Sequence, residues 1–64
     1  MNKYQIGDRF TRKWTRDSGV LEIDRIIPSF SSDVTYELHQ VINERVKKRL
    51  TQVELDNDYY KIKN

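Results

Sequence analysis

Residues 34–42 read VTYELHQVI, and this stretch decides the fold class because its apolar and polar side chains alternate. Successive side chains of a β-strand point to opposite faces of the sheet. The apolar residues of one parity are predicted to face the core: Val34, Tyr36, Leu38 and Ile42. The polar residues of the other parity are predicted to face water: Thr35, Glu37 and His39. The pattern indicates a strand with one buried face and one exposed face.

A second strand is predicted for residues 20–27, and Pro28 should end it because proline cannot donate a hydrogen bond to a neighbouring strand. Its predicted inward residues are Leu21, Ile23 and Ile27. Arg25 shares their parity, however, and Ile26 shares the parity of the acidic outward residues. A β-bulge or burial on both faces would explain this mixed pattern.

Another strand is predicted for residues 46–50, after a three-residue hairpin loop at residues 43–45. A loop of that length keeps Ile42 and Val46 on the same face of the sheet. The predicted inward residues of this strand are Val46 and Leu50, and the outward ones are Lys47 and Arg49.

On the amino-terminal side, residues 1–4 are predicted to be a loose end, and Gly7 with Asp8 predicts a turn into a strand over residues 9–15. Phe10 and Trp14 share the inner face of this strand, which favours a core position for Trp14 over a base-stacking one. The next turn is predicted at residues 17–19, with Gly19 in the left-handed conformation.

The carboxy-terminal part opens with a capping box, in which Thr51 and Glu54 each satisfy a free backbone amide at the start of a helix. Two continuations fit the residues that follow. Helical spacing of three apolar side chains predicts one amphipathic helix that closes an end of the sheet; they are Leu55, Tyr59 and Ile62. Alternatively, a single turn at residues 52–57 is followed by a fifth strand over residues 59–63.

Strands at intervals of about ten residues with tight turns predict a single domain, residues 1–64, built as a small, strongly bent sheet or barrel. Residues 6–10 (IGDRF) followed by residues 19–23 (GVLEI) resemble the opening of SH3-like and KOW-type small barrels. Residues 50–55 (LTQVEL) with residues 59–62 (YYKI) are similar to the tail of short uncharacterised proteins from phages and mobile elements of Gram-positive bacteria.

The predicted fold class is therefore mainly β: a small SH3-like, partly open barrel of four or five antiparallel strands with a short C-terminal helix. The resemblance implies binding to nucleic acid or to a protein surface. It implies no particular binding residue in this chain.

Composition limits the functions that the chain can perform. It has 64 residues and no cysteine. A chain of this length buries only about 60% of the surface that its unfolded form exposes, so a deep catalytic cleft is hard to build. The absence of thiols excludes thiolate metal sites and fits a reducing cytosol. Because the apolar runs are far too short to span a membrane, the predicted location is cytoplasmic, without a membrane partner.

Enzymatic activity is not predicted. His39 shares its parity with Glu37, and the pair could shuttle protons, but an exposed histidine in a charged row is the simpler interpretation. A base also needs a nucleophile and an oxyanion site around it. The two glycines are too few for a phosphate-binding loop, and the aspartates do not have the spacing of a calcium loop. No metal and no cofactor are expected.

The charge distribution suggests a nucleic-acid partner as the first hypothesis. The net charge is only +2, but residues 1–51 hold ten Lys and Arg against seven Asp and Glu. Basic side chains spaced along strands can follow a phosphate backbone. The predicted phosphate contacts are Arg9, Lys13, Lys47 and Arg49. The alternative is a solvated polar face whose cations protect the sheet edges against pairing with other strands. Outward acids favour this alternative because they dilute the positive field.

The second hypothesis is a protein-interaction module, or an inhibitor of a host factor encoded by a phage or mobile element. On a helix, Val53 and Tyr60 would form a secondary apolar edge, and these are the predicted partner contacts. Neither the partner's identity nor the oligomeric state follows from the residues.

Overall fold

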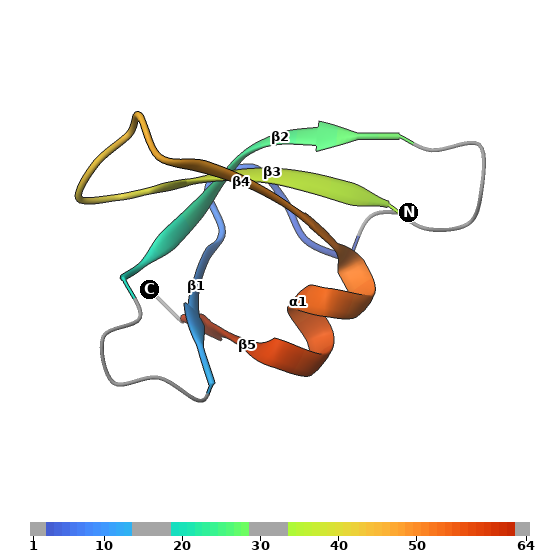
Figure 1. The fold of residues 1–64 in the computed structure, drawn as a ribbon. Helices are drawn as coiled ribbons and strands as arrows, with labels where there is room; N and C mark the ends of the chain where they lie inside the picture. Colours follow the sequence, from blue (N-terminus) through green and yellow to red (C-terminus); the bar gives the residue numbers. More distant parts are fainter. Residues whose placement is uncertain (1–2, 14–18, 29–33, 63–64) are drawn as a thin grey trace.

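A computed structural model describes residues 3–13, 19–28 and 34–62 of the chain (Figure 1). These residues form β1 (Arg9–Arg12), β2 (Leu21–Ile27), β3 (Thr35–Gln40), β4 (Lys47–Thr51), α1 (Gln52–Asp58) and β5 (Tyr59–Ile62). All five strands belong to one antiparallel sheet in the order β4-β3-β2-β1-β5. The prediction of a mainly β fold with a short helix near the carboxyl terminus is confirmed.

The sheet is strongly bent and is not closed. Strands β1 to β4 follow one another as a meander, and the chain then passes through α1 so that β5 pairs with the free side of β1. Figure 1 shows α1 linking the two halves of the bend, with β3 and β4 in one half and β1 and β5 in the other. Strands β4 and β5 are therefore the two edges of the sheet.

The core lies inside the bend and takes side chains from every element. Its buried residues are Tyr4, Phe10, Leu21, Ile23, Tyr36, Leu38, Leu50, Leu55 and Tyr59. Residues directly opposite each other in antiparallel strands share a face, and the inward pairs are Phe10 with Leu21, Ile23 with Leu38 and Tyr36 with Leu50. The alternation of residues 34–38 is thus confirmed.

A bulge in β2 explains the mixed parity of that strand. The register with β3 shifts between Ile23 and Arg25, so Ile26 lies opposite the buried Tyr36 and packs against the core. Ile27 pairs with Thr35, one residue further along, and therefore lies on the outer parity. The prediction that Ile27 points inward is wrong because the extra residue exchanges the two faces beyond it.

The hairpin between β3 and β4 is longer than predicted. Strand β3 ends at Gln40, whose N–H donates to the carbonyl of Val46 at 3.0 Å, so the loop begins before Ile42. The side chain of Ile42 is 90% exposed and that of Val46 is 44% exposed. The prediction that Ile42 points inward is wrong, because β3 ends before it and Ile42 lies in the loop. Val46 keeps the parity of Leu50 through its bond to Gln40, but it is not part of the buried core.

At the carboxyl end, the alternative of a short helix followed by a fifth strand is the correct one. The capping box is present, with the Thr51 hydroxyl accepting from the Glu54 N–H at 3.2 Å and the Glu54 carboxylate accepting from the Thr51 N–H at 3.1 Å. The helix ends at Asp58, after a run of weak helix formers, and the aromatic residues Tyr59 and Tyr60 continue as strand.

The amino-terminal segment is part of the fold rather than a loose end, at least from Lys3 onward. The Tyr4 side chain is buried, and its ring meets those of Phe10 and Tyr36 edge-on at centroid distances of 4.9 and 5.8 Å. The predicted core position of Trp14 lies outside the described residues.

Gly7 makes the turn into β1 in a conformation that favours glycine, with φ of +98°. The Asp8 N–H donates to the Gln5 carbonyl at 3.1 Å, and the Gly7 N–H donates to the Ile23 carbonyl at 2.9 Å. Gly19 has no positive φ, so the left-handed conformation predicted there is wrong. The other two residues of that predicted turn lie outside the described part of the chain.

Replacing Gly7 with alanine should lower the free energy of unfolding by about 1 to 2 kcal/mol, because a Cβ is disfavoured at positive φ. The cost is conformational alone, since no atom lies within 4 Å of the position a Cβ would take. Gly19→Ala is the matched control and should have little effect. Urea unfolding of both variants measures the difference, and equal stability would contradict the conformational role of Gly7.

Candidate functional site

The outer face of the sheet carries a row of charged side chains in which acids alternate with bases. Cross-strand pairing places Arg9 opposite Glu22, Glu22 opposite His39, and His39 opposite Lys47. The predicted phosphate contacts Arg9 and Lys47 therefore share a face, but two strands lie between them. Adjacent strands are about 4.8 Å apart, so the two cations stand at opposite ends of the row.

Three cations of this face have carboxylate partners. The Arg9 Nε donates to Glu22 at 2.9 Å, and the Arg49 Nε donates to Glu37 at 3.1 Å. The Lys47 Nζ lies 3.7 Å from Glu37 and 3.9 Å from Asp24. Interleaved charges of this kind give a weak net field, which is the dilution that the sequence analysis set against phosphate binding.

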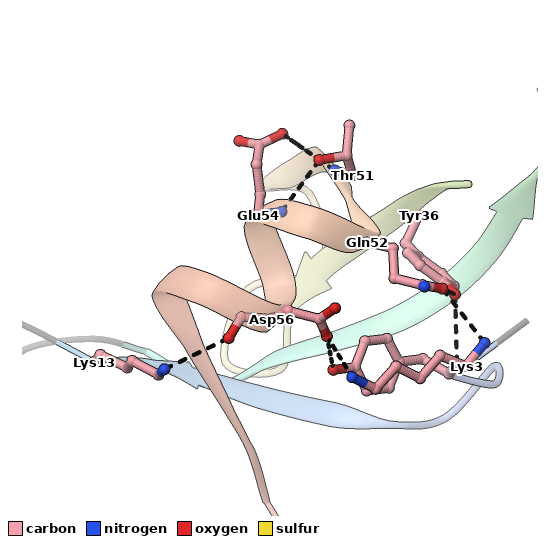
Figure 2. Close-up of polar contacts among 8 residues, drawn as sticks. Lys3, Lys13, Tyr36, Thr51, Gln52, Glu54 and Asp56 are labelled. Carbon is pink, nitrogen blue, oxygen red and sulfur yellow. Dashed lines mark hydrogen bonds and ion pairs between the residues drawn. The ribbon is translucent and has the colours of Figure 1, made fainter. Parts of the chain in front are cut away.

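Lys13, the fourth predicted phosphate contact, is held at the end of α1. Its Nζ lies 3.5 Å from the backbone carbonyl of Asp56 (Figure 2). The same atom lies 5.1 Å from the centre of the Tyr60 ring. A cation is favourable there because the last carbonyls of a helix lack intrahelical partners and carry partial negative charge. Lys13 thus joins β1 to α1 and β5 and stands apart from the row of Arg9 and Lys47.

The parity of the sequence suggested a pair between His39 and Glu37, but the structure does not form it. Its side chain is only 14% exposed, with Nδ1 at 2.9 Å from Asp24 and Nε2 at 3.6 Å from Glu22. Because both ring nitrogens face carboxylates, neither is directed at a position where a substrate could give up a proton. The histidine is a structural link between β2 and β3.

A polar network connects the amino-terminal segment to α1 (Figure 2). The Tyr4 hydroxyl donates to the Asp56 carboxylate, and the Lys3 Nζ lies 2.9 Å from the same oxygen. The Tyr36 hydroxyl donates to the Gln52 side-chain oxygen at 2.9 Å and accepts from the Tyr4 N–H at 3.4 Å. These bonds satisfy the polar ends of two core tyrosines, as buried phenols require.

Charge pairing shifts the pKa values of this network. The hydrogen bond from Tyr4, followed by that from Lys3, lowers the pKa of Asp56. Burial, and then the bond to Asp56, raise the pKa of Tyr4, and the same carboxylate raises the pKa of Lys3. At neutral pH all three groups are in the form that the network stabilises, so the contribution is lost only in acid or in strong base.

The predicted partner contacts Val53 and Tyr60 belong to different elements. Val53 lies on α1 and is 55% exposed, whereas Tyr60 lies on β5 opposite Thr11 and is 58% exposed. Both face solvent, as predicted. The helical spacing that placed them on one edge does not apply, because the helix ends before Tyr60.

A cluster that the sequence analysis missed lies where the β3–β4 hairpin meets the start of β2. We call Val20, Val41, Ile42 and Val46 the apolar tip. The Val41 N–H donates to the Val20 carbonyl at 2.9 Å, and Gly19, Val20, Val41 and Ile42 line a shallow hollow. The sequence analysis begins the loop at Asn43, and the β-branched residues Val41 and Ile42 gave no local signal that the strand ends at Gln40.

Among the described residues, no group of three or more histidines, acids or cysteines could hold a metal ion. Within the same part of the chain, no helix is long and apolar enough to cross a membrane. No protein family, curated protein or solved structure matches the chain.

We expect Asp56→Asn to flatten the acid limb of the stability curve. The pKa of Asp56 is lower in the folded state, so its stabilisation is complete above the unfolded pKa of about 4 and is lost as the pH falls through the folded pKa. Thermal melts between pH 2 and pH 7 measure this. Asp58→Asn, on the same helix, is the control, and identical acid limbs for the two variants would contradict the role of Asp56.

Tyr4→Phe keeps the buried ring and removes its hydrogen bond to Asp56, so it should lower the free energy of unfolding by about 1 kcal/mol. Tyr60→Phe, at an exposed phenol, should change it by much less. Chemical unfolding at neutral pH compares the two variants. An unchanged stability in Tyr4→Phe would show that the network does not hold the amino-terminal segment.

Proposed function

We propose that the protein is a small non-enzymatic module that binds another protein. The observation that carries this proposal is the apolar tip. Val20, Val41 and Ile42 line one shallow hollow, and the hairpin residues Val41, Ile42 and Val46 are 38%, 90% and 44% exposed. In a protein with so small a core, leaving such side chains in water has a cost that burial against a partner would offset. Contiguous exposed apolar residues with polar surroundings are typical of interaction sites.

The charged face supports a protein partner over a nucleic acid. Three carboxylates, those of Glu22, Asp24 and Glu37, contact the cations of the row. A phosphate backbone would meet these acids as well as the bases. Because nucleic-acid affinity depends on uncompensated cations that release counterions, this arrangement disfavours it.

The finer fold class that we propose is an SH3-like, partly open barrel. The supporting features are the meander of β1 to β4, the helix inserted between β4 and β5, and the pairing of β5 with β1. Small barrels of this kind present loops and edge strands as binding surfaces, which suits an interaction module.

Fluorescence anisotropy tests the nucleic-acid alternative. We expect labelled single-stranded DNA, duplex DNA and RNA to remain unbound at physiological salt. Micromolar binding would contradict the proposal if it is electrostatic. In that case the logarithm of the association constant falls by about 0.7 to 0.9 for each phosphate contact with every tenfold rise in salt concentration. Weakening of that binding in a Lys47→Gln/Arg49→Gln variant, with unchanged thermal stability, would assign it to the charged face.

Site-specific photo-crosslinking tests the protein partner. A benzophenone amino acid at position 42 should give a discrete, nuclease-resistant adduct in an extract of the organism that encodes the protein. The same probe at Asn57, an exposed residue of α1, should give none. Val46→Asp should abolish the adduct without unfolding the protein, because Val46 is already partly exposed. Equal labelling from both positions would overturn the proposal.

A further inference from the structure

We propose that the free edge of β4, with Val46 beside it, binds an extended acidic segment of the partner protein as an additional strand of the sheet. This inference rests on the proposed function and names the partner's chemistry. It starts from the position of β4, which is an edge strand of five residues with exposed side chains at Lys47, Lys48 and Arg49.

The register shows which backbone groups of β4 are available. The pair Gln40 and Val46 has one ladder bond, from the Gln40 N–H to the Val46 carbonyl at 3.0 Å, while the Val46 N–H donates to the Asn43 carbonyl within the loop. Such pairs alternate in an antiparallel ladder, so Lys48 and Leu50 also bond to β3. The N–H and C=O groups of Lys47 and Arg49 point the other way, and no described residue is hydrogen-bonded to them.

The charges at this edge select an acidic strand. Lys47 and Arg49 lie on one face of β4 with side-chain exposures of 56% and 65%, and both share the carboxylate of Glu37. Lys48, on the other face, contacts only the neutral hydroxyl of Tyr59 among the described residues, at 3.3 Å. An added strand would lie on the side of β4 away from β2 and β3. Its carboxylates would therefore reach Lys47 and Arg49 without lying over the acids of the face, which a phosphate chain crossing the face would meet.

The same cations disfavour pairing of β4 with a second copy of itself. An antiparallel β4–β4 pair would place Lys47, Lys48 and Arg49 near one another across the interface, and like charges opposite each other are destabilising. Lysines on edge strands commonly prevent aggregation in this way. Here the cations of β4 would exclude a second copy of β4, while the backbone groups of the strand stay open to a strand of opposite charge.

The order of side chains along β4 predicts which residue types the partner segment needs. In an antiparallel strand beside β4, the residue opposite Arg49 comes first, and the residue opposite Lys47 comes two positions later on the same face. The next residue lies opposite Val46, which is 44% exposed and belongs to the apolar tip. The expected segment is therefore an acid, any residue, an acid, and an aliphatic residue, in extended conformation.

Peptide binding tests this pattern directly. A blocked peptide containing Glu-Thr-Glu-Val should bind at least about tenfold more tightly than its Lys-Thr-Lys-Val counterpart, since opposite-charge pairs replace like-charge pairs. In the wild-type complex, amide hydrogen exchange at Lys47 and Arg49 should slow. Exchange at Lys48 and Leu50, already bonded to β3, is the internal control. Equal affinity for the two peptides, or unchanged exchange at Lys47 and Arg49, would overturn the proposal.

Two variant pairs separate strand addition from charge attraction alone. Lys47→Pro should bind the acidic peptide less than Lys47→Gln does, because only proline removes the outward N–H, and an outward N–H at the start of an edge strand tolerates proline. Lys47→Gln/Arg49→Gln should lose the preference for the acidic peptide, whereas the control Arg25→Gln/Lys61→Gln should keep it. Equal binding by Lys47→Pro and Lys47→Gln would overturn strand addition.

The photo-crosslinked adduct from position 42 tests the proposed function separately. If neither peptide binds while the adduct persists, the edge proposal fails and the protein-binding function stands. If the adduct is also missing, both fail.

Discussion

The bulge in β2 is the feature on which both surfaces of the sheet depend. Before it, Leu21 and Ile23 face the core, and after it Ile26 does, although regular alternation would send Ile26 outward. A bulge also increases the local twist, which bends the strand. A single sheet can enclose a core only if it bends, because a flat sheet of this size has one face with nothing to pack against.

The second requirement is a cover for the open end of the bend. Helix α1 supplies Leu55, which is fully buried, and the amino-terminal segment supplies Tyr4. These two pieces are far apart in the sequence and meet through the carboxylate of Asp56, which accepts from both Tyr4 and Lys3. The helix is too short to be stable alone, so its capping box and these tertiary contacts maintain it together.

The surface divides into a charge-balanced face and an apolar tip, joined by the edge of β4. On the face, the bulge brings Asp24 beside His39 and Lys47, so the acids of β2 and β3 neutralise the bases of β1 and β4. At the tip, aliphatic side chains stay exposed. Because β4 runs from the tip along the edge, a partner strand could contact both its free backbone groups and Val46. From this arrangement we propose recognition of an extended protein segment rather than of a phosphate chain.

Local sequence determined the elements that depend on neighbours in the chain. The alternation of residues 34–38 specified a half-buried strand, Thr51 with Glu54 specified the helix start, and Gly7 with Asp8 specified a turn, since pleat, cap and backbone conformation act over a few residues.

Tertiary structure decided the rest. Residues 59–62 fit a helix or a strand equally well until β1 offered a hydrogen-bonding partner. The exposure of Ile42 depended on where the bent sheet ended. The bulge in β2 depended on the pairing of that strand with β3. The predicted phosphate contacts Arg9, Lys47 and Arg49 each lie within 4 Å of a carboxylate from a neighbouring strand. A count of charges along the chain shows how many bases there are, but only strand register shows which acid stands beside each one.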